Sequence, residues 1–511
     1  MAVGKFQHQF RDSHAACYSI RLTRVLLLSV LALVALQLFF VGAYNNSYGF
    51  DLSLRGPSKY DRNRLVADLL EMNTLNEICL NAKDAVISFQ TNGTNRLLLT
   101  PEMDHALLLE HLGDCHDVDV FLPSDLRSHG YCEDGMAYVQ FLHARALPHW
   151  VFDMRFQRAD GTFTTYFELC PTTPLVLMNH YWRGVPDMAK FPDEKPVVLM
   201  PNIEMHELRA QHYWSVDYVL CKTRDCYRRV VAWYAQEGNP RKTRVLYTQH
   251  TSSDPTTLTK WHSKQHAVER IKPRDFRSLR FFHANGHSTQ KSTRQILDCW
   301  AGRDDLPPLD LYSLDESSRD HYHELFANAT PANIAFHWGD DVNAVAFGKL
   351  LAEAPVILCP SKMEGFGHYI NQARASGALV LTTNGAPMNE LVDANSGVLI
   401  AADVIPSAGH QMLAPDFKYK HGLRNATSME YDVHGSYICD AVDTVLKMPS
   451  YERERRATNG RDRYLAQIKF FRRKMEELLN ELKGTGTFLN EVPDDLDDDP
   501  VEKTLRKKRQ P

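Results

Sequence analysis

A glutamate stands directly before a Gly-Phe-Gly turn in residues 360–390, PSKMEGFGHYINQARASGALVLTTNGAPMNE, between a predicted strand and a predicted helix. Small glycines let the backbone approach a ligand closely, and the free N–H groups at a helix start favour an anion. The carboxylate of Glu364 suits hydroxyl groups instead, because it can accept hydrogen bonds from them in pairs. Together with Gly365, Phe366 and Gly367, it predicts a loop that binds a diphosphate beside a sugar.

A second candidate anion-binding turn lies earlier, in residues 285–297, NGHSTQKSTRQIL. Lys291 lies near the start of a predicted helix, where its ammonium can stabilise the charge on a diphosphate leaving group as a glycosidic bond breaks. A lone lysine in a first helical turn is usually only solvated, but this one lies at the equivalent strand end of the same domain. Asn285 and Gly286 are most simply turn residues. The turn lacks the GxxxxGK[ST] spacing of a Walker A loop.

Both turns follow short apolar runs of the kind that suits strands buried on both faces of a parallel sheet. In the first half of the chain, such runs lie at residues 84–89, 118–123, 174–180, 196–202 and 216–222. In the second half, they lie at residues 279–286, 309–314, 333–339, 355–361 and 378–383. Helical patterns separate the runs, which predicts two Rossmann-like α/β domains that face each other across a cleft. Ligands of such sheets collect beyond the carboxyl ends of the strands, where both turns lie.

Residues 360–392 resemble the donor-binding signature of retaining GT-B glycosyltransferases of the family 4 type. That signature is a Pro-Ser, a Glu-Gly-Phe-Gly, a helix ending Ala-x-Gly, a strand and a Pro-x-x-Glu-like turn. The segment HANGHSTQKST resembles the family's earlier phosphate-binding turn, with Lys291 at the matching lysine. The resemblance is specific over residues 279–400 and only architectural over residues 84–250.

The resemblance implies transfer of a sugar, of the hexosyl type, from a nucleotide-diphosphate donor with retention of configuration. The acceptor would be a glycan, a lipid or a protein, and neither a metal nor a cofactor would be needed. The implied residues are catalytic Glu364 and Lys291, donor-binding Gly286, His287, Gly365, Phe366, Gly367, Gln372 and Glu390, and acceptor-side His180. No dedicated nucleophile is expected, because the leaving diphosphate can itself help to deprotonate the acceptor.

This chain departs from the family pattern at two positions. The family has a second acid where this chain has Gln372, which keeps a hydrogen bond to a ribose but loses its charge-assisted component. His287 stands near the place of the family's arginine. An alternative is therefore a catalytically decayed GT-B-fold protein that binds a sugar or glycan. His180 has a structural alternative as a buried histidine, and Glu390 as a favourable charge at a helix start.

The sequence offers little that would hold a metal. Asp117 and Asp119 imitate a DxD motif but alternate like a strand edge, and the acidic run 497–499 lies in the tail. No Cys/His cluster has zinc spacing. The net charge of −5 gives no reason to expect a nucleic acid partner, and 44% hydrophobic with 24% charged residues is an ordinary globular composition.

An uncharged apolar run at residues 25–44 is long enough to span a bilayer as a helix. Arg21 and Arg24 precede it, which predicts a cytosolic N-terminus and a type II single-pass protein with its catalytic body in the lumen of the Golgi or endoplasmic reticulum. A signal peptide cleaved after residues 41–43 is the competing interpretation. Four sequons, at Asn45, Asn92, Asn328 and Asn425, agree with the luminal orientation, and the absence of glycans on them would indicate a cytosolic one.

Ten cysteines include Cys17 in the predicted cytosolic tail, so nine remain and at least one has no intramolecular partner. Disulfides are expected among Cys79, Cys115, Cys132 and Cys170, with no pairing readable from the sequence. The predicted organisation is a cytosolic tail (1–24), a transmembrane signal-anchor (25–44), a stem (45–80), an N-terminal acceptor domain (81–250), a C-terminal donor domain (251–450), a helical segment (451–483) and a disordered charged tail (484–511).

Overall fold

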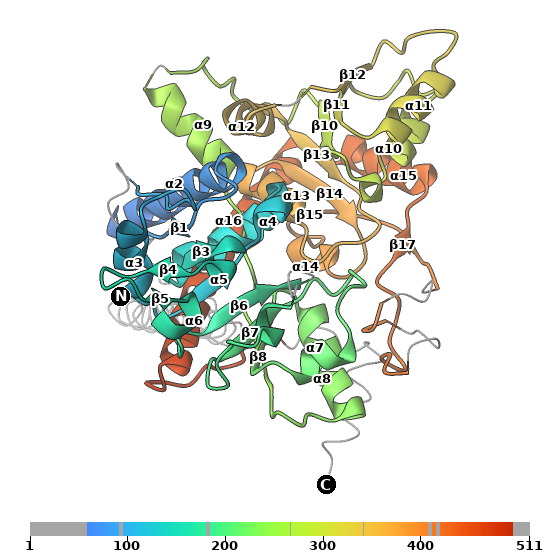
Figure 1. The fold of residues 1–511 in the computed structure, drawn as a ribbon. Helices are drawn as coiled ribbons and strands as arrows, with labels where there is room; N and C mark the ends of the chain where they lie inside the picture. Colours follow the sequence, from blue (N-terminus) through green and yellow to red (C-terminus); the bar gives the residue numbers. More distant parts are fainter. Residues whose placement is uncertain are drawn as a thin grey trace, which may run out of the picture. The chain divides into compact units, whose positions relative to one another are not determined.

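The computed structural model describes residues 59–90, 96–179, 184–265, 267–340, 342–406, 411–414 and 420–493 (Figure 1). The chain divides into two units, residues 1–65 and 66–511. The first is represented only by the opening turns of helix α2 (Lys59–Asn81). The predicted anchor at residues 25–44 lies outside the described part of the chain, and no helix within that part is long and apolar enough to cross a membrane.

The second unit contains two parallel sheets, and the first is built from the amino-terminal half of the chain. Its strands are β1 (Ile87–Ser88), β2 (Asp119–Phe121), β3 (Arg145–Leu147), β6 (Leu175–Met178), β7 (Val197–Met200), β8 (Tyr218–Cys221) and β9 (Arg244–Tyr247). They lie in the order β1-β3-β2-β6-β7-β8-β9, and only β1 runs antiparallel to its neighbour. Every residue of β6 and β7 is buried, as expected for apolar strands covered on both faces.

The helices of this half follow its strands. They are α3 (His105–Gly113), α4 (His129–Phe141), α5 (Trp150–Asp153), α6 (Tyr166–Leu169), α7 (Ala210–Trp214) and α8 (Arg224–Glu237). Short 3-10 turns lie at Ser124–Leu126 and Val185–Asp187, and β4 (Phe156–Gln157) pairs with β5 (Phe163–Thr164) as a hairpin. Helix α8 ends before Gly238, as its sequence predicts.

The second sheet is parallel throughout. Its strands are β10 (Phe281–Ala284), β11 (Leu309–Ser313), β12 (Ile334–Trp338), β13 (Val356–Cys359), β14 (Leu379–Thr383) and β15 (Gly397–Ile400), in the order β12-β11-β10-β13-β14-β15. Its helices are α9 (Pro255–Lys264), α10 (Thr293–Trp300), α11 (Glu316–Leu325), α12 (Ala344–Glu353), α13 (His368–Ser376), α14 (Met388–Leu391) and α15 (Gly435–Lys447), and β16 (Asp403–Val404) pairs with β17 (Tyr431–Asp432).

Alternate side chains of these strands pack into two separate cores. Phe281, Leu358 and Leu381 share one core with Trp300 of α10 and Ile438 of α15. Phe282, Ile357 and Val380 share the other with Leu351 of α12 and Ile370 of α13. Helices therefore cover both faces of the second sheet, and the predicted α/β class with parallel sheets is confirmed.

The strand order of each sheet creates a switch point. In the second sheet, the chain runs outward from β10 through β11 to β12 and then returns to form β13 on the other side of β10. The loops that follow β10 and β13 therefore leave the same edge in opposite directions, which is where open α/β sheets bind ligands. In the first sheet, the corresponding neighbours are β2 and β6.

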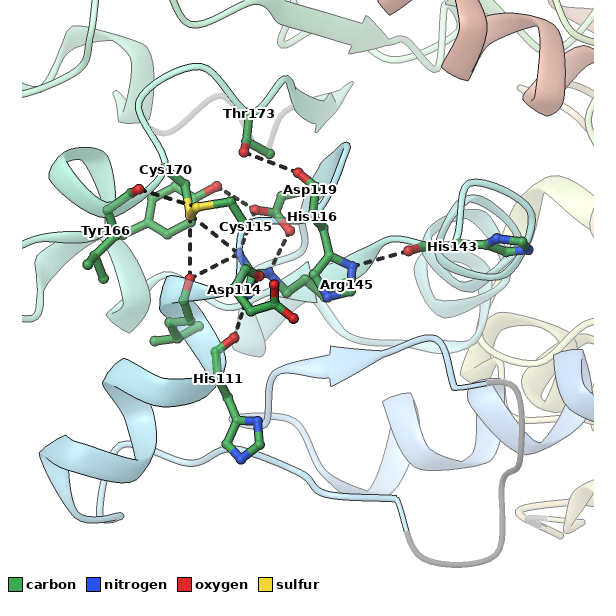
Figure 2. A network of polar contacts seen from close by, with 12 residues as sticks. His111, Asp114, Cys115, His116, Asp119, His143, Arg145, Tyr166, Cys170 and Thr173 are labelled. Carbon is green, nitrogen blue, oxygen red and sulfur yellow. Dashed lines mark hydrogen bonds and ion pairs between the residues drawn. A yellow bond between two sulfur atoms is a disulfide. The ribbon is translucent and has the colours of Figure 1, made fainter. Parts of the chain in front are cut away.

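Of the two acids that imitate a DxD motif, Asp117 is exposed and pairs with Lys483, whereas Asp119 belongs to a buried structural network (Figure 2). Arg145 donates from its Nε to Oδ1 of Asp119 over 2.8 Å, and the hydroxyl of Tyr166 donates to the other carboxylate oxygen. Arg145 also donates to the carbonyl of His111 over 2.9 Å, near the end of α3. Since Asp119 is fully buried and paired, this carboxylate holds neighbouring segments of the first sheet together.

Four disulfides join eight of the nine cysteines of the described part, namely Cys79–Cys132, Cys115–Cys170, Cys221–Cys226 and Cys299–Cys439. Cys359, at the end of β13, is buried and free. The odd number of cysteines after Cys17 had predicted such a leftover thiol.

Helix α16 (Ser450–Leu482) runs along elements of both sheets. The hydroxyl of Tyr464 donates to the carbonyl of Ser252 over 2.8 Å, and Phe471 packs edge-on against Tyr138 of α4. Nearer its start, Arg453 donates to the carbonyl of Phe276 over 2.8 Å. One continuous helix thus stabilises the first sheet through α4 and the second through its own first turns.

Residues 484–493, assigned from the sequence to the disordered tail, are ordered and fold back onto the edge strand β9. Phe488 is buried, and Asn490 accepts from the amide of Tyr247 over 2.9 Å and donates to the carbonyl of Val245 over 2.9 Å. An edge strand has backbone groups without a strand partner, and Asn490 satisfies two of them. The charged composition of the tail predicted disorder and gave no sign of the contacts that Phe488 and Asn490 make.

Candidate functional site

The two turns predicted from the sequence lie side by side at the switch point of the second sheet. The amide of Lys362 donates to the carbonyl of Gln290 over 2.8 Å, so the loops after β13 and β10 are joined by a backbone hydrogen bond. The ammonium of Lys291 forms an ion pair with Glu364. These two residues come from segments 73 positions apart, and the fold brings their charged groups into contact.

Neighbouring side chains hold this pair in place. The hydroxyl of Ser361 donates to Glu364 and lies 2.6 Å from the hydroxyl of Tyr369. The ammonium of Lys291 lies 4.1 Å from the centre of the Tyr369 ring, a cation–π contact. Because both charged groups are mostly buried, a bound anion would meet an ammonium that is already positioned.

The predicted glycines and aromatic residue of the two turns have different local roles. Gly367 has φ of 98° and directly precedes α13, a backbone conformation that favours glycine. Gly286 is exposed, with φ of 57°, and the neighbouring His287 is also exposed. Phe366 is buried, with its ring 5.1 Å from that of His250, so it packs the loop against the first domain.

Two polar side chains of the turn that carries Lys291 (residues 285–297) have no hydrogen-bond partner within the described ranges. Both side-chain atoms of Asn285 and the hydroxyl of Ser292 are buried without a hydrogen bond. Buried polar groups are normally paired, so these atoms are available to a polar ligand at the same turn that carries Lys291. The sequence pattern around Asn285 had predicted only a turn residue there.

The carboxyl edge of the first sheet contributes a buried charged cluster. Lys222, directly after β8, lies 3.0 Å from each carboxylate oxygen of Asp134 on α4. His368, the first residue of α13, lies 3.0 Å from Oδ1 of the same carboxylate through Nε2, and its Nδ1 lies 2.8 Å from the hydroxyl of Ser252. Burial alone would raise the pKa of Asp134, but Lys222 and His368 outweigh burial and hold that pKa well below its ordinary value.

This cluster contains the one group of potential metal ligands found among the described residues. The ligand atoms of Asp134, His250 and His368 lie within 4.8 Å of one another. Burial lowers the pKa of His250 to about 4, so its imidazole is neutral at pH 7 and could act as a ligand. Lys222, however, already supplies a cation to both oxygens of Asp134. The cluster therefore has a counter-ion within the chain itself.

Gln372, expected from the resemblance to contact a ribose, is turned toward the first domain. Its amide nitrogen donates to Oε1 of Glu133 over 2.9 Å and to the hydroxyl of Ser253 over 3.1 Å. The other oxygen of Glu133 accepts from the amide of Ser253 over 2.8 Å. A neutral amide fits this position because Glu133 already provides the negative charge.

Glu390 is also engaged by the first domain. It accepts from the amides of Arg224 over 2.8 Å and Asp225 over 2.9 Å, at the start of α8. The alternative expected from the sequence was a favourable charge at the start of the helix that Glu390 itself begins. Glu390 lies in the first turn of α14, and its hydrogen bonds go to a different helix, 165 residues away in the chain. Burial raises the pKa of this carboxyl.

Some predicted residues fall elsewhere. His180, Asn45 and Asn92 lie outside the described residues. Asn328 and Asn425 are exposed, which leaves both sequons accessible.

Four charged residues of the site were not singled out from the sequence, although all four follow strands of the first sheet. They are Glu133, Asp134, Lys222 and Glu204. Their position after predicted strands was the one available signal.

No protein-family model and no curated protein sequence matches this chain. Sucrose-phosphate synthase from Thermosynechococcus elongatus is a solved structure with 11% identity and a TM-score of 0.43, over 67% of this chain and 84% of that one. For α,α-trehalose 6-phosphate synthase from Burkholderia multivorans, identity is 10% and the TM-score 0.44, over 61% and 71% of the two chains. A glycosyltransferase from Rickettsia africae has 12% identity and a TM-score of 0.40, over 61% and 76%. At these values, the likenesses assign neither a family nor a function to this chain.

Replacing Lys222 with methionine should destabilise the protein by about 3–5 kcal/mol at pH 7, because it leaves the buried Asp134 carboxylate without its cation. The lowered pKa of Asp134 contributes stability above its unfolded-state value, which is lost as the pH falls through the folded-state value. The loss of unfolding free energy caused by Lys222→Met, measured by urea unfolding, should therefore become smaller as the pH falls. Lys190→Met, in an exposed pair with Glu168, is the control and should change stability little. Equal effects of the two variants would contradict this interpretation.

Gln372→Glu should destabilise the protein at neutral pH by about 1–3 kcal/mol, because two carboxylates then face each other in place of a hydrogen bond. One carboxyl of the pair acquires a raised folded-state pKa, so stability is lost as the pH rises above about 4.3. Melting curves between pH 4 and 8 measure this. The double variant Glu133→Gln with Gln372→Glu should recover stability, and the exposed Gln211→Glu should have little effect. A loss of stability at Gln372→Glu that does not depend on pH would contradict the assignment.

Proposed function

We propose that this chain is a glycosyltransferase of GT-B architecture that transfers a sugar from a nucleotide-diphosphate donor with retention of configuration. The observation that carries the proposal is the contact between Lys291 and Glu364 at the switch point of the second sheet. A cation for phosphate and a carboxylate for hydroxyls are thereby placed side by side. In a nucleotide sugar, the diphosphate is joined directly to a sugar that carries hydroxyl groups, so one ligand could contact both side chains.

The diphosphate would lie beside Lys291 and the start of α13, where free backbone amides favour an anion. The unpartnered atoms of Asn285 and Ser292 offer further polar contacts in the same turn. The sugar hydroxyls would donate to Glu364, whose carboxylate is already oriented by Ser361. This arrangement favours breakage of the bond between the anomeric carbon and the diphosphate, because Lys291 stabilises the charge that develops on the leaving group.

The proposed reaction uses orientation and charge stabilisation, with the acceptor bound by the first domain. The donor would be a nucleotide hexose and the acceptor a glycan, a lipid or a protein. Lys291 would carry the diphosphate charge without a metal or cofactor. The decayed sugar-binding alternative rested on Gln372, and the contact between Gln372 and Glu133 gives that residue a local role instead.

Replacing Lys291 with methionine should weaken binding of both a nucleoside diphosphate and its sugar conjugate, by about tenfold to a hundredfold, because a charged hydrogen bond is lost. Glu364→Gln should weaken only the nucleotide sugar, because it removes an acceptor for sugar hydroxyls. Isothermal titration with a panel of nucleotide sugars measures both. Lys264→Met, exposed at the end of α9, is the matched control.

Turnover of the same panel with candidate acceptors distinguishes an enzyme from a binding protein. Donor binding without transfer or hydrolysis in the unsubstituted protein would favour the decayed alternative. Binding that neither Lys291→Met nor Glu364→Gln affects would contradict the proposed site.

We further propose that residues 25–44 anchor the protein in the membrane of the Golgi or endoplasmic reticulum, with the catalytic body in the lumen. Four disulfides support an oxidising compartment. In cells, endoglycosidase treatment should increase the mobility of the protein, and the variants Asn328→Gln and Asn425→Gln should each remove part of that shift. A protein that carries no glycan at any sequon would contradict the luminal orientation.

A further inference from the structure

A carboxylate of the first domain lies directly against the Glu-Gly-Phe-Gly loop. Glu204 follows β7, and a Cβ atom added to Gly365 would overlap its carboxylate, 2.7 Å from the carboxyl carbon. Glycine at position 365 is therefore what allows Glu204 to reach the loop. The carbonyl of Glu204 accepts from the side-chain amide of Gln411 over 2.9 Å, which helps to fix the residue's backbone.

One oxygen of this carboxylate has no partner. Oε2 of Glu204 is buried and makes no hydrogen bond to any residue that the structure describes. A buried carboxylate oxygen normally has a donor, and leaving it unpaired costs free energy. An unpaired acceptor beside a proposed ligand loop indicates that the missing donor belongs to a ligand.

The surroundings of Glu204 include charges of both signs. Lys222 after β8 and Asp134 on α4 face it from the first domain, Glu364 from the donor loop, and Tyr213 from α7. Burial, more than any of these charges, raises the pKa of Glu204 to about 7. Glu364 and Asp134 act in the same direction, and Lys222 opposes them. A carboxyl group with this pKa can both take up and release a proton near neutral pH.

We propose that Glu204 accepts the proton of the acceptor hydroxyl that attacks the donor sugar, an inference that rests on the proposed function. The acceptor O–H bond breaks and its proton passes to the Glu204 carboxylate, while the oxygen forms a bond to the anomeric carbon of the donor on the face from which the diphosphate leaves, so that the configuration is retained. The bond from that carbon to the diphosphate breaks, and its electron pair leaves with the diphosphate beside Lys291. The proton therefore goes to the first domain and not to the leaving group.

The test is the pH dependence of transfer by the full chain, with the nucleotide sugar that it turns over and a matching acceptor. Because only the ionised carboxylate accepts a proton, the wild-type rate should rise with pH through about 7. Glu204→Gln should lose this rise and lower the rate at pH 7.5 by about 10²–10⁴-fold, the usual contribution of a general base. Donor affinity, measured by titration, should be unchanged.

Two variants separate this role from a structural one. Glu204→Asp keeps a carboxylate with a shorter reach, so it should be slower than the wild type but retain a rise with pH. Glu194→Gln, at an exposed carboxylate shortly before β7, is the control and should keep both the rate and the pH profile of the wild type. A Glu204→Gln enzyme with the wild-type rate and profile would overturn the inference while leaving the proposed function intact.

A stability measurement provides a readout that does not depend on activity. The pKa of Glu204 is raised on folding from 4.5 to about 7, so its favourable contribution is complete below pH 4.5 and is lost as the pH rises to about 7. The melting temperature of Glu204→Gln minus that of the wild type should therefore increase as the pH rises from 5 to 8. A constant difference would show that Glu204 is not the buried, proton-binding group described here. A wild type without transfer or donor binding would contradict the proposed function, and this inference with it.

Discussion

The buried carboxylate of Asp134 joins the two domains at the candidate site. It lies on α4 of the first domain, takes its counter-ion from Lys222 of the same domain, and contacts His368 of the second. His368 directly follows Gly367 and begins α13, so the position of this contact fixes where the Glu-Gly-Phe-Gly loop ends. Breaking a buried ion pair destabilises a protein strongly. The contacts of Asp134 therefore fix the position of the carboxyl edge of one sheet relative to that of the other.

Other polar contacts near Asp134 also join the two domains. Glu133 holds Gln372, and Glu390 caps the start of α8, so each domain supplies an acceptor for a donor of the other. Phe366 adds an apolar contact to His250. Because these groups are already satisfied within the protein, they position the loop. The ion pair of Lys291 with Glu364, the carboxylate of Glu204 and the unpartnered Asn285 and Ser292 line the place proposed for the ligand.

The sequence predicts much of the fold, because buried parallel strands appear as continuous apolar runs and the helices between them have readable ends. It also predicts the loop of Glu364 and the turn of Lys291, since glycine and charge patterns are local. It does not predict the contact of Glu133 with Gln372, which joins residues 239 positions apart, or the approach of Glu204 to Gly365. Such pairs depend on how the two sheets pack, and no periodicity encodes that packing. The cysteine pairings were unreadable for the same reason, as was the anchoring of Asn490 on β9.

A crystal structure of the protein with a nucleotide sugar bound would locate the donor. We expect the diphosphate beside Lys291 and the start of α13, with sugar hydroxyls on Glu364. A nucleotide sugar bound away from both residues, or bound with the sugar at Lys291 and the diphosphate remote from it, would rule out this donor site.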